Sequence, residues 1–580
     1  MIERCVGTGV ECVGDIELQC EDGETQSMRD CLDEGLSCIS GRGCQLCLPG
    51  SISCDGDIPI YCNATGDGWD VGDACEPGLR CSTRGCLDLC ADAEGAESYI
   101  GCEYWPTTAS NSQLGREFDF AVVVANPQLV SAAVIVERDG EVEASAIIPP
   151  GELETLRLPW VDALKGNEIG AESSAHVRAG AYRLRSDVPV TVYQFNPLEY
   201  RIDTDCADEP ADARDGRCYS FSNDASLLLP THVLTGSYIG LARPSMVIEL
   251  PNVPPTIIGS PGFLAITAVR DDTQVEITAR AFISGSTDSS VPALAPGETA
   301  TITMGQGDVV QLLSAIPTTC PGEWVEEESG AGTIRYCNAG AQYDLTGTEL
   351  RATRPVAVIG GHNCTFVPFD RWACDHLEEA LFPVESWGRS VLVGTTRPIR
   401  GEPNLMRVVS AADDNQLRVE PISTEDIELD RGAYFEMPLT SHVRVTGTQP
   451  FAVVQYLVGQ DYAGLGSSGV AGIGDPSMSL AIPNEQYRNE YTFLAPQTYS
   501  TSYVNVTATM GSSVFFNGRL LGELSPIGDT GAGVMRLEVG SGVHRLESTS
   551  PFGVVVYGFG NYTSYMYPAG LDFREIAPPI

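Results

Sequence analysis

Pro355-Val356-Ala357-Val358-Ile359 is the stretch of sequence from which the fold is predicted. The same pattern, a proline followed by apolar and β-branched residues, begins again at Pro189, Pro450 and Pro551. Proline is tolerated at the first residue of a strand because its missing N–H is not needed there, and β-branched residues favour extended backbone. Each run therefore predicts a buried β-strand, and four copies predict four related modules.

A second landmark, an apolar residue followed by proline, opens each module: Trp105-Pro106, Leu229-Pro230, Phe382-Pro383 and Ile482-Pro483. Between the two landmarks, apolar and polar residues alternate with the period of a half-buried strand, which predicts hairpins. Helical periodicity is confined to short pieces, Trp160–Leu164 and the stretch after Cys374.

The hairpin of module two carries an acidic turn, Asp271-Asp272-Thr273, and that of module three carries Asp413-Asp414-Asn415. Such pairs would suit calcium ligation or acid–base chemistry. We favour plain turns, because module four has Met510-Gly511-Ser512 at this place and keeps the turn without acids.

The sequence thus predicts an all-β protein of tandem antiparallel β-sandwich-like modules behind a small disulfide-rich region, with a β-propeller as the alternative. Blades of about 40–50 residues are shorter than these modules, which disfavours the propeller. The predicted units are two Cys-rich repeats, at 1–46 and at 47–102 with a linker, and four β modules at 103–225, 226–375, 376–477 and 478–580.

Fourteen of the 20 cysteines lie in the first 102 residues and form an internal repeat. The first unit holds Cys5, Cys12, Cys20, Cys31, Cys38 and Cys44, and the second holds Cys47, Cys54, Cys62, Cys75, Cys81 and Cys86. A unit of about 40 residues buries too little apolar surface to fold alone, so we expect each set of six to pair within itself as disulfides. The connectivity stays open among 15 arrangements.

The other cysteines fall in close pairs, for which we expect the disulfides Cys90–Cys102, Cys206–Cys218, Cys320–Cys337 and Cys364–Cys374. The last pair is flanked by His362 and His376, so Cys₂His₂ zinc is the alternative. In an oxidising compartment the disulfide is favoured, and we expect no cofactor and no catalytic metal.

Composition limits the partners. The formal net charge is −44, with 78 acidic and 34 basic residues, which argues against binding of nucleic acid. No apolar run reaches the ~18 residues of a membrane helix. The cysteines indicate an extracellular or cell-surface protein, and because no secretory signal follows Met1, we expect an upstream segment that is missing here.

Several stretches within roughly residues 99–573 carry a family resemblance: Asp344–Thr348, Arg354–Val358, Gly361–Cys364, Cys374–Glu379, Gly474–Met478, Tyr557–Phe559 and Ser564–Pro568. They resemble the N-terminal domain of IgGFc-binding proteins. The resemblance implies a secreted or surface protein, with bacterial relatives that often carry Cys-rich repeats in front. Binding of IgG does not follow, because no motif for it maps onto this chain.

We therefore expect a non-enzymatic binding or adhesion protein whose ligand is an extracellular glycan or glycoprotein, held by loops at module ends. Aromatic residues would stack on sugar rings if exposed, although packing in cores is the commoner role; the candidates are Trp69, Trp372, Trp387, Tyr562, Tyr565 and Tyr567. The alternatives are an extracellular metallohydrolase built on His362 and His376 and a purely structural matrix protein.

Overall fold

The computed structural model of the protein describes residues 5, 7–166, 173–202, 218–250, 256–329, 332–371, 374–399, 401–423, 425–460 and 472–580. Almost all regular structure in these ranges is antiparallel β-sheet. The predicted all-β fold of tandem sandwich modules behind a disulfide-rich region is confirmed.

Each module has eight strand positions arranged in two sheets, with the orders 1-6-3-4 and 5-2-7-8. In module one these are β11 (Gly101–Tyr104), β12 (Phe120–Ala125), β13 (Ala132–Arg138), β14 (Glu141–Ile148), β15 (Leu153–Leu158), the long β17 (Arg183–Asn196), which serves as positions six and seven, and β20 (Asp224–Leu227). In module two they are β21 (Ser237–Ile239), β24 (Gly262–Ala268), β25 (Thr273–Thr278), β26 (Thr299–Met304), β27 (Val309–Leu313), β30 (Glu349–Ala352), β31 (Val356–Phe366) and β32 (Cys374–Ala380).

Modules three and four repeat this order. Module three contains β33 (Ser390–Val393), β34 (Asn404–Ser410), β35 (Asn415–Glu420), β36 (Ile427–Leu429), β37 (Tyr434–Leu439), β38 (Val443–Gly447), β39 (Phe451–Leu457) and β40 (Ser477–Leu480). Module four contains β41 (Arg488–Ala495), β42 (Thr501–Thr509), β43 (Val514–Phe516), β44 (Arg519–Leu520), β46 (Ala532–Val539), the long β47 (Gly542–Gly560) and β48 (Thr563–Pro568).

The two sheets of a module share one apolar core. In module three, Val391 and Val445 of one sheet pack with Met406 and Val453 of the other, and all four are buried. The predicted Pro-led runs lie at strand position seven, in the middle of the second sheet, which explains why they are apolar on both faces.

The predicted hairpins with acidic turns are wrong. β24 and β25 belong to different sheets, as do β34 and β35 in module three. The turn carries the chain across the sandwich, and Asp272 and Asp414 sit there with φ of 53° and 54°. Asp tolerates this left-handed backbone, so the acids serve the turn.

The apolar-Pro landmarks lead into short 3₁₀ turns before modules two, three and four: η2 (Thr231–Val233), η4 (Val384–Ser386) and η6 (Asn484–Gln486). Trp105-Pro106 differs, because it follows the first strand of module one instead of preceding it. The predicted helix near Trp160 is α2 (Asp162–Lys165), but the stretch after Cys374 is strand β32.

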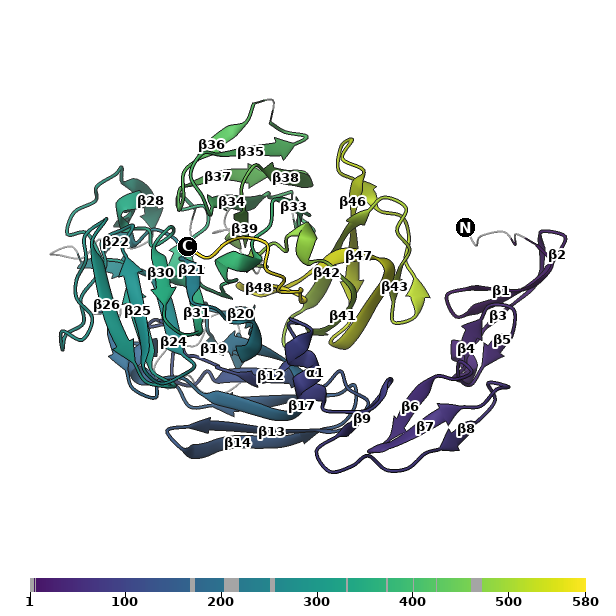
Figure 1. Ribbon diagram of the computed structural model, residues 1–580. Coiled ribbons are helices and arrows are strands. Elements are labelled where there is room, and N and C mark those ends of the chain that lie inside the picture. The colour runs from purple at the N-terminus through teal and green to yellow at the C-terminus, as the bar shows by residue number, and fades with distance from the viewer. Residues whose placement is uncertain are drawn as a thin grey trace.

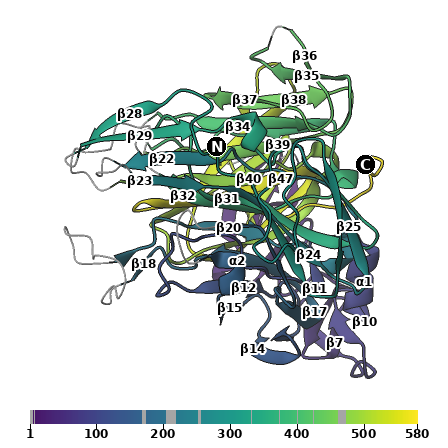
Figure 2. The same ribbon diagram turned by 90° about the vertical axis from the view of Figure 1, so that its left-hand side faces the viewer.

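The four modules are arranged in a ring whose centre is formed by their last strands (Figure 1). β20 contacts β32 and β48, and β40 contacts the same two strands, so the four axial strands enclose a common axis. Seen from the side, β20, β31 and β32 lie between module three and module one (Figure 2). The axial strands pair within the preceding module, so each module ends later than the boundaries 225, 375 and 477 expected from the sequence.

The ring is closed where its ends meet. Ser98 forms an antiparallel bridge with Asp572, and the buried Tyr99 accepts a hydrogen bond from Thr492 N. Between modules two and three, buried Arg407 donates to Asp344 Oδ2 over 2.8 Å and lies 4.0 Å above the ring of Tyr434. Charge and packing therefore join neighbouring modules.

The N-terminal arm consists of small disulfide-bonded sheets that project from the ring beside module four (Figure 1). The arm begins with the strands β1 (Gly9–Val13), β2 (Ile16–Glu21) and β3 (Glu24–Asp30), and helix α1 (Leu89–Gly95) stands at its end. The two units share one connectivity, first to third, second to fifth and fourth to sixth cysteine: Cys5–Cys20, Cys12–Cys38, Cys31–Cys44, then Cys47–Cys62, Cys54–Cys81, Cys75–Cys86.

The structure also joins Cys90 to Cys102 and Cys320 to Cys337. The expected pair Cys206–Cys218 lies partly outside the described residues, since Cys206 falls in 203–217. Across the described ranges, no helix is long and apolar enough to span a membrane.

Candidate functional site

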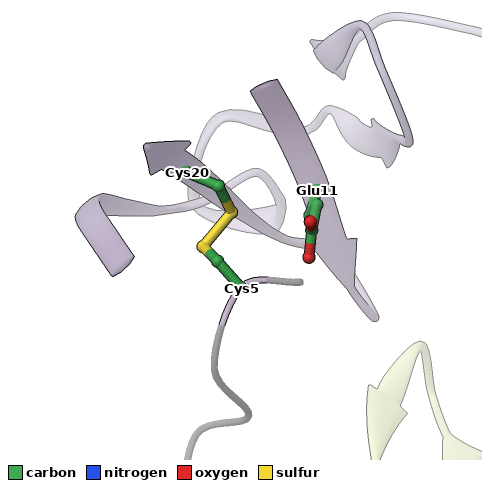
Figure 3. Close-up of side chains that lie close together, drawn as sticks. All are labelled: Cys5, Glu11 and Cys20. Atoms are coloured by element: carbon green, nitrogen blue, oxygen red, sulfur yellow. A yellow bond between two sulfur atoms is a disulfide. The ribbon is translucent and has the colours of Figure 1, made fainter. Parts of the chain in front are cut away.

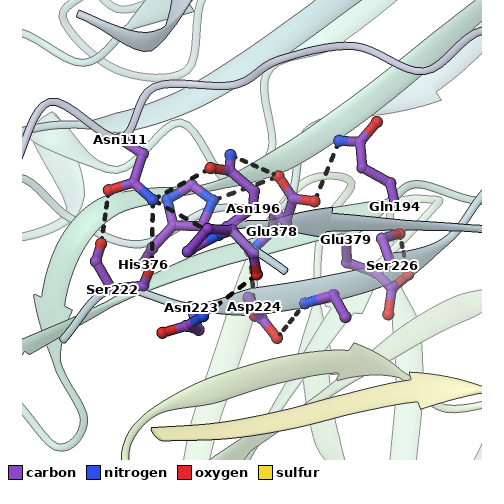
Figure 4. A network of polar contacts seen from close by, with 12 residues as sticks. Asn111, Gln194, Asn196, Ser222, Asn223, Asp224, Ser226, His376, Glu378 and Glu379 are labelled. Carbon is purple, nitrogen blue, oxygen red and sulfur yellow. Dashed lines mark hydrogen bonds and ion pairs between the residues drawn. The ribbon is translucent and has the colours of Figure 1, made fainter. Parts of the chain in front are cut away.

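The most unusual feature of the ring is a polar core on its axis, where acidic side chains are completely buried (Figure 4). The carboxylates come from three of the axial strands or the residues just before them: Asp224, Asp375, Glu378, Glu379 and Asp475. Burial of an ionised carboxylate is costly unless hydrogen bonds or a cation compensate it. Each of these groups therefore needs a physical explanation.

Asp224 holds three modules together. Its Oδ1 accepts from Ser477 Oγ over 2.7 Å and from Ala225 N, and its Oδ2 accepts from Glu378 N and Met478 N, each over 3.1 Å. Burial raises the pKa of Asp224 well above its ordinary value, although these donors oppose the shift. The three backbone N–H groups can only donate, so the carboxylate form satisfies them.

Glu378 is surrounded by donors from module one and by a histidine. Gln194 Nε2 donates to Glu378 Oε1 over 3.1 Å, and Asn196 Nδ2 donates to Oε2 over 3.0 Å. His376 Nε2 lies 3.3 Å from the same Oε2, and its ring stacks on Phe263. Neighbouring Glu379 accepts from Ser226 Oγ over 2.8 Å, and burial raises its pKa well above the usual range.

His362 has a different role from the one that a metal site would give it. Its Nε2 lies 3.0 Å from Pro244 O, and its Nδ1 accepts from Cys364 N over 3.1 Å. Both ring nitrogens are thus used, as in a neutral imidazole, and burial lowers the pKa of His362 to about 3. His362 is therefore a neutral, hydrogen-bonded residue of the core.

The four candidate zinc ligands are not arranged as a zinc centre. Cys364 and Cys374 form a disulfide, so neither sulfur is available as a thiolate ligand. His362 and His376 are both fully buried, so a substrate has no access to them. An open coordination position of the catalytic type is therefore absent from this part of the described chain.

The atoms of Cys5, Glu11 and Cys20 that could ligate a metal also lie close together in the arm (Figure 3). The two sulfurs form a disulfide, and the carboxylate of Glu11 accepts a hydrogen bond from Gly7 N over 3.1 Å. This cluster stabilises the arm.

The aromatic candidates divide into two groups. Trp387, Tyr565 and Tyr567 are at most 1% exposed, so they pack in cores, which is the commoner role expected from the sequence, and they cannot stack on sugar rings. Tyr562 is half-buried and contacts Tyr219 edge-on, and Trp69 is half-buried in the arm. Trp372 lies outside the described residues.

An open groove with a volume of about 960 Å³ lies between the arm and module four. One wall is formed by five residues of the first Cys-rich unit and the other by residues 510–513 and 519–524; the five are Val13, Asp15, Ile16, Asp30 and Leu32. Leu32, Met510 and Leu520 are 38–42% exposed there, and Arg519 lies 3.9 Å from Asp30 across the groove. A groove with apolar and charged walls suits a macromolecular surface better than a small substrate.

The fold and the site together define a disulfide-rich β protein of several modules. Its polar core is buried away from solvent, and an open groove lies between the arm and module four. The sequence model of the family described as IgGFc binding protein matches residues 224–558, from the start of β20 to a point within β47 of module four. The chain belongs to this family, and the resemblance inferred from Cys374–Glu379 and the other stretches is confirmed. No curated protein matches the sequence.

Proposed function

We propose that the protein is an extracellular or cell-surface, non-enzymatic binding protein that holds a glycoprotein in the groove between the arm and module four. Membership of a family described by binding of IgG Fc supports a binding role. The disulfides of the arm support an oxidising compartment.

The observation that carries the proposal is the groove itself. Exposed Leu32, Met510 and Leu520 offer apolar contact, while Asp15, Asp30 and Glu523 make its rim acidic. With a net charge of −44, the chain repels acidic partners at low salt, so the partner's contact surface is neutral or basic. A purely structural protein has no need for such an open apolar groove.

Surface plasmon resonance on the immobilised full chain tests this function. The probes are human IgG Fc, a mucin glycoprotein and a panel of the glycans released from both. We expect at least one glycoprotein to bind and Leu520→Asp to weaken that binding at least tenfold. Leu129→Asp is the matched control, because Leu129 is 38% exposed on module one and Leu520 is 39% exposed.

Three other outcomes would contradict the proposal. Binding that Leu520→Asp and Leu129→Asp leave equally unchanged would place the site elsewhere. Binding of the released glycans alone, with the affinity of the whole glycoprotein, would make the protein a lectin. Absence of binding to every probe would favour the structural matrix protein.

A further inference from the structure

The four modules place equivalent side chains at one level of the axis. The strand register pairs Tyr193 with Leu227, Ile359 with Ala380, Val454 with Leu480 and Val555 with Pro568, which are equivalent positions of the four modules. Five residues before each of the second partners stand Ser222, Asp375, Asp475 and Thr563. We call these four residues the axial ring.

Every member of the axial ring is buried and carries an oxygen. Asp375 and Thr563 are 0% exposed, and Ser222 and Asp475 are 1% exposed. Within the described part of the chain, Asp375 Oδ2 and Asp475 Oδ1 have no hydrogen-bond partner. The hydroxyls of Thr563 and buried Tyr499 lie beside each other, and the charges of Asp224 and Asp375 both act on Tyr499.

Unpaired buried oxygens of this number are rare in native proteins, and each needs a ligand, a proton or a water. Asp375 Oδ1 accepts from Asn223 N over 2.6 Å and from His376 N over 2.8 Å. These two bonds favour the ionised carboxylate and leave Oδ2 free to face another group. Burial, and then the charge of Asp475, raise the pKa of Asp375 well above its ordinary value, so the two carboxylates lie close enough to affect each other.

The chemistry of the donors selects the type of cation. The unpaired ring atoms are carboxylate oxygens and the other ring members carry hydroxyls, whereas the unpaired Nδ1 of the neighbouring His376 does not belong to the ring. Hard cations prefer such ligands, and Ca²⁺ accepts irregular sets of carboxylate and neutral oxygens more readily than Mg²⁺ does. Ser222 Oγ donates its hydrogen to Asn111 Oδ1, so its lone pairs are free as well.

We propose that the axial ring binds one Ca²⁺ ion through Asp375 and Asp475, with oxygens of Ser222, Thr563 and Tyr499 in its surroundings. The ion neutralises the two carboxylates and ties the last strands of all four modules to one point. This calcium site is independent of the groove and of the proposed function. Binding of the ion makes the stability of the ring of modules depend on calcium.

The test uses the full chain after treatment with a chelator. Elemental analysis after re-equilibration is expected to find about one calcium per chain, and about 2 mM Ca²⁺ is expected to raise the thermal midpoint by about 5 °C or more. Tb³⁺ added in place of Ca²⁺ should luminesce when tyrosine is excited, because Tyr499 lies at the site. Asp475→Asn should weaken the calcium effect at least tenfold in affinity, whereas exposed Asp529→Asn should leave it unchanged.

Asp475→Asn has nearly the same shape as the original side chain and removes a buried charge, so the variant should fold. An equal thermal midpoint with Ca²⁺ and with chelator, together with less than a tenth of an equivalent of bound metal, would overturn the proposal and assign the ring to protons or water. A calcium effect that Asp475→Asn leaves intact would overturn it too, because the ion would then lie elsewhere.

Discussion

Replacement of Asp224 by asparagine should loosen the centre of the ring. The carboxylate accepts four hydrogen bonds, and its Oδ2 serves two amides from different modules, Glu378 N and Met478 N. Asparagine keeps one oxygen and replaces the other by an NH₂ group. If the oxygen stays toward Ser477, two buried N–H groups face a donor instead of an acceptor.

A buried donor that loses its acceptor costs about 1–3 kcal/mol, so the two amides together account for about 2–6 kcal/mol. The variant no longer buries a charge, which returns part of this cost. We therefore expect a net loss of about 2–5 kcal/mol in the free energy of unfolding, measured by urea denaturation. Asp529→Asn, an exposed change of the same type, should change it by less than about 0.5 kcal/mol.

Hydrogen exchange shows whether the loss arises where the structure places it. The amides of Glu378 and Met478 should exchange faster in Asp224→Asn, while those of β25 and β35, at the outer sheets, should keep their rates. A variant as stable as the wild type, with unchanged exchange at both amides, would refute the role of Asp224 as an ionised acceptor and indicate a protonated carboxyl.

Three further predictions follow from other buried groups. Arg407→Met leaves buried Asp344 without its cation and should cost about 3–5 kcal/mol in urea denaturation, whereas exposed Arg418→Met should cost about 1 kcal/mol or less; equal losses would contradict the interface between modules two and three. Burial lowers the pKa of His362 to about 3, so the contribution of this neutral histidine to stability is complete above pH ~6.5 and falls by up to about 1.4 kcal/mol per pH unit between pH ~6.5 and 3. His362→Gln should therefore flatten this part of the pH profile of urea denaturation, and an unaltered slope would contradict the prediction. Residues 88–580 retain α1, the Cys90–Cys102 disulfide and the Ser98 bridge and should melt in one cooperative transition by calorimetry, whereas residues 103–580 lose part of β11 and the buried Tyr99 and should melt at lower temperature; equal midpoints would show that the closure of the ring is dispensable.

The sequence contained enough local signal to predict the modules. The Pro-led runs are apolar over five residues because they occupy the middle of a sheet, and periodicity finds such strands readily. The corner between β24 and β25 was predicted as a hairpin because alternation of apolar residues does not distinguish two strands of one sheet from strands of facing sheets. Only long-range pairing separates these cases.

The polar axis was harder to predict. In sequence, β32 resembles a short helix or an acidic loop, because Cys374–Ala380 carries two pairs of polar or charged residues, Asp375-His376 and Glu378-Glu379, on either side of Leu377. One signal was present: Ser222, Asp375 and Asp475 each stand eight residues before a landmark proline, Pro230, Pro383 or Pro483. The significance of that spacing depends on the ring, which brings together strands that lie far apart in the sequence.

The histidine and cysteine cluster shows the opposite case. The spacing of His362, Cys364, Cys374 and His376 suggested either a disulfide or zinc, and both remained chemically sound on sequence alone. Burial decides how the imidazoles are used, since one is held by Pro244 O and the other stacks on Phe263. Neither contact has a local sequence signature.

Hydrogen exchange of the full chain, alone and with the glycoprotein that binds it most tightly, tests the assignment of the binding surface most directly. The account predicts slower exchange on binding at the residues that line the two walls of the groove, which lie within 13–16, 30–32, 510–513 and 519–524. Protection confined to other modules, with both walls of the groove unchanged, would contradict it.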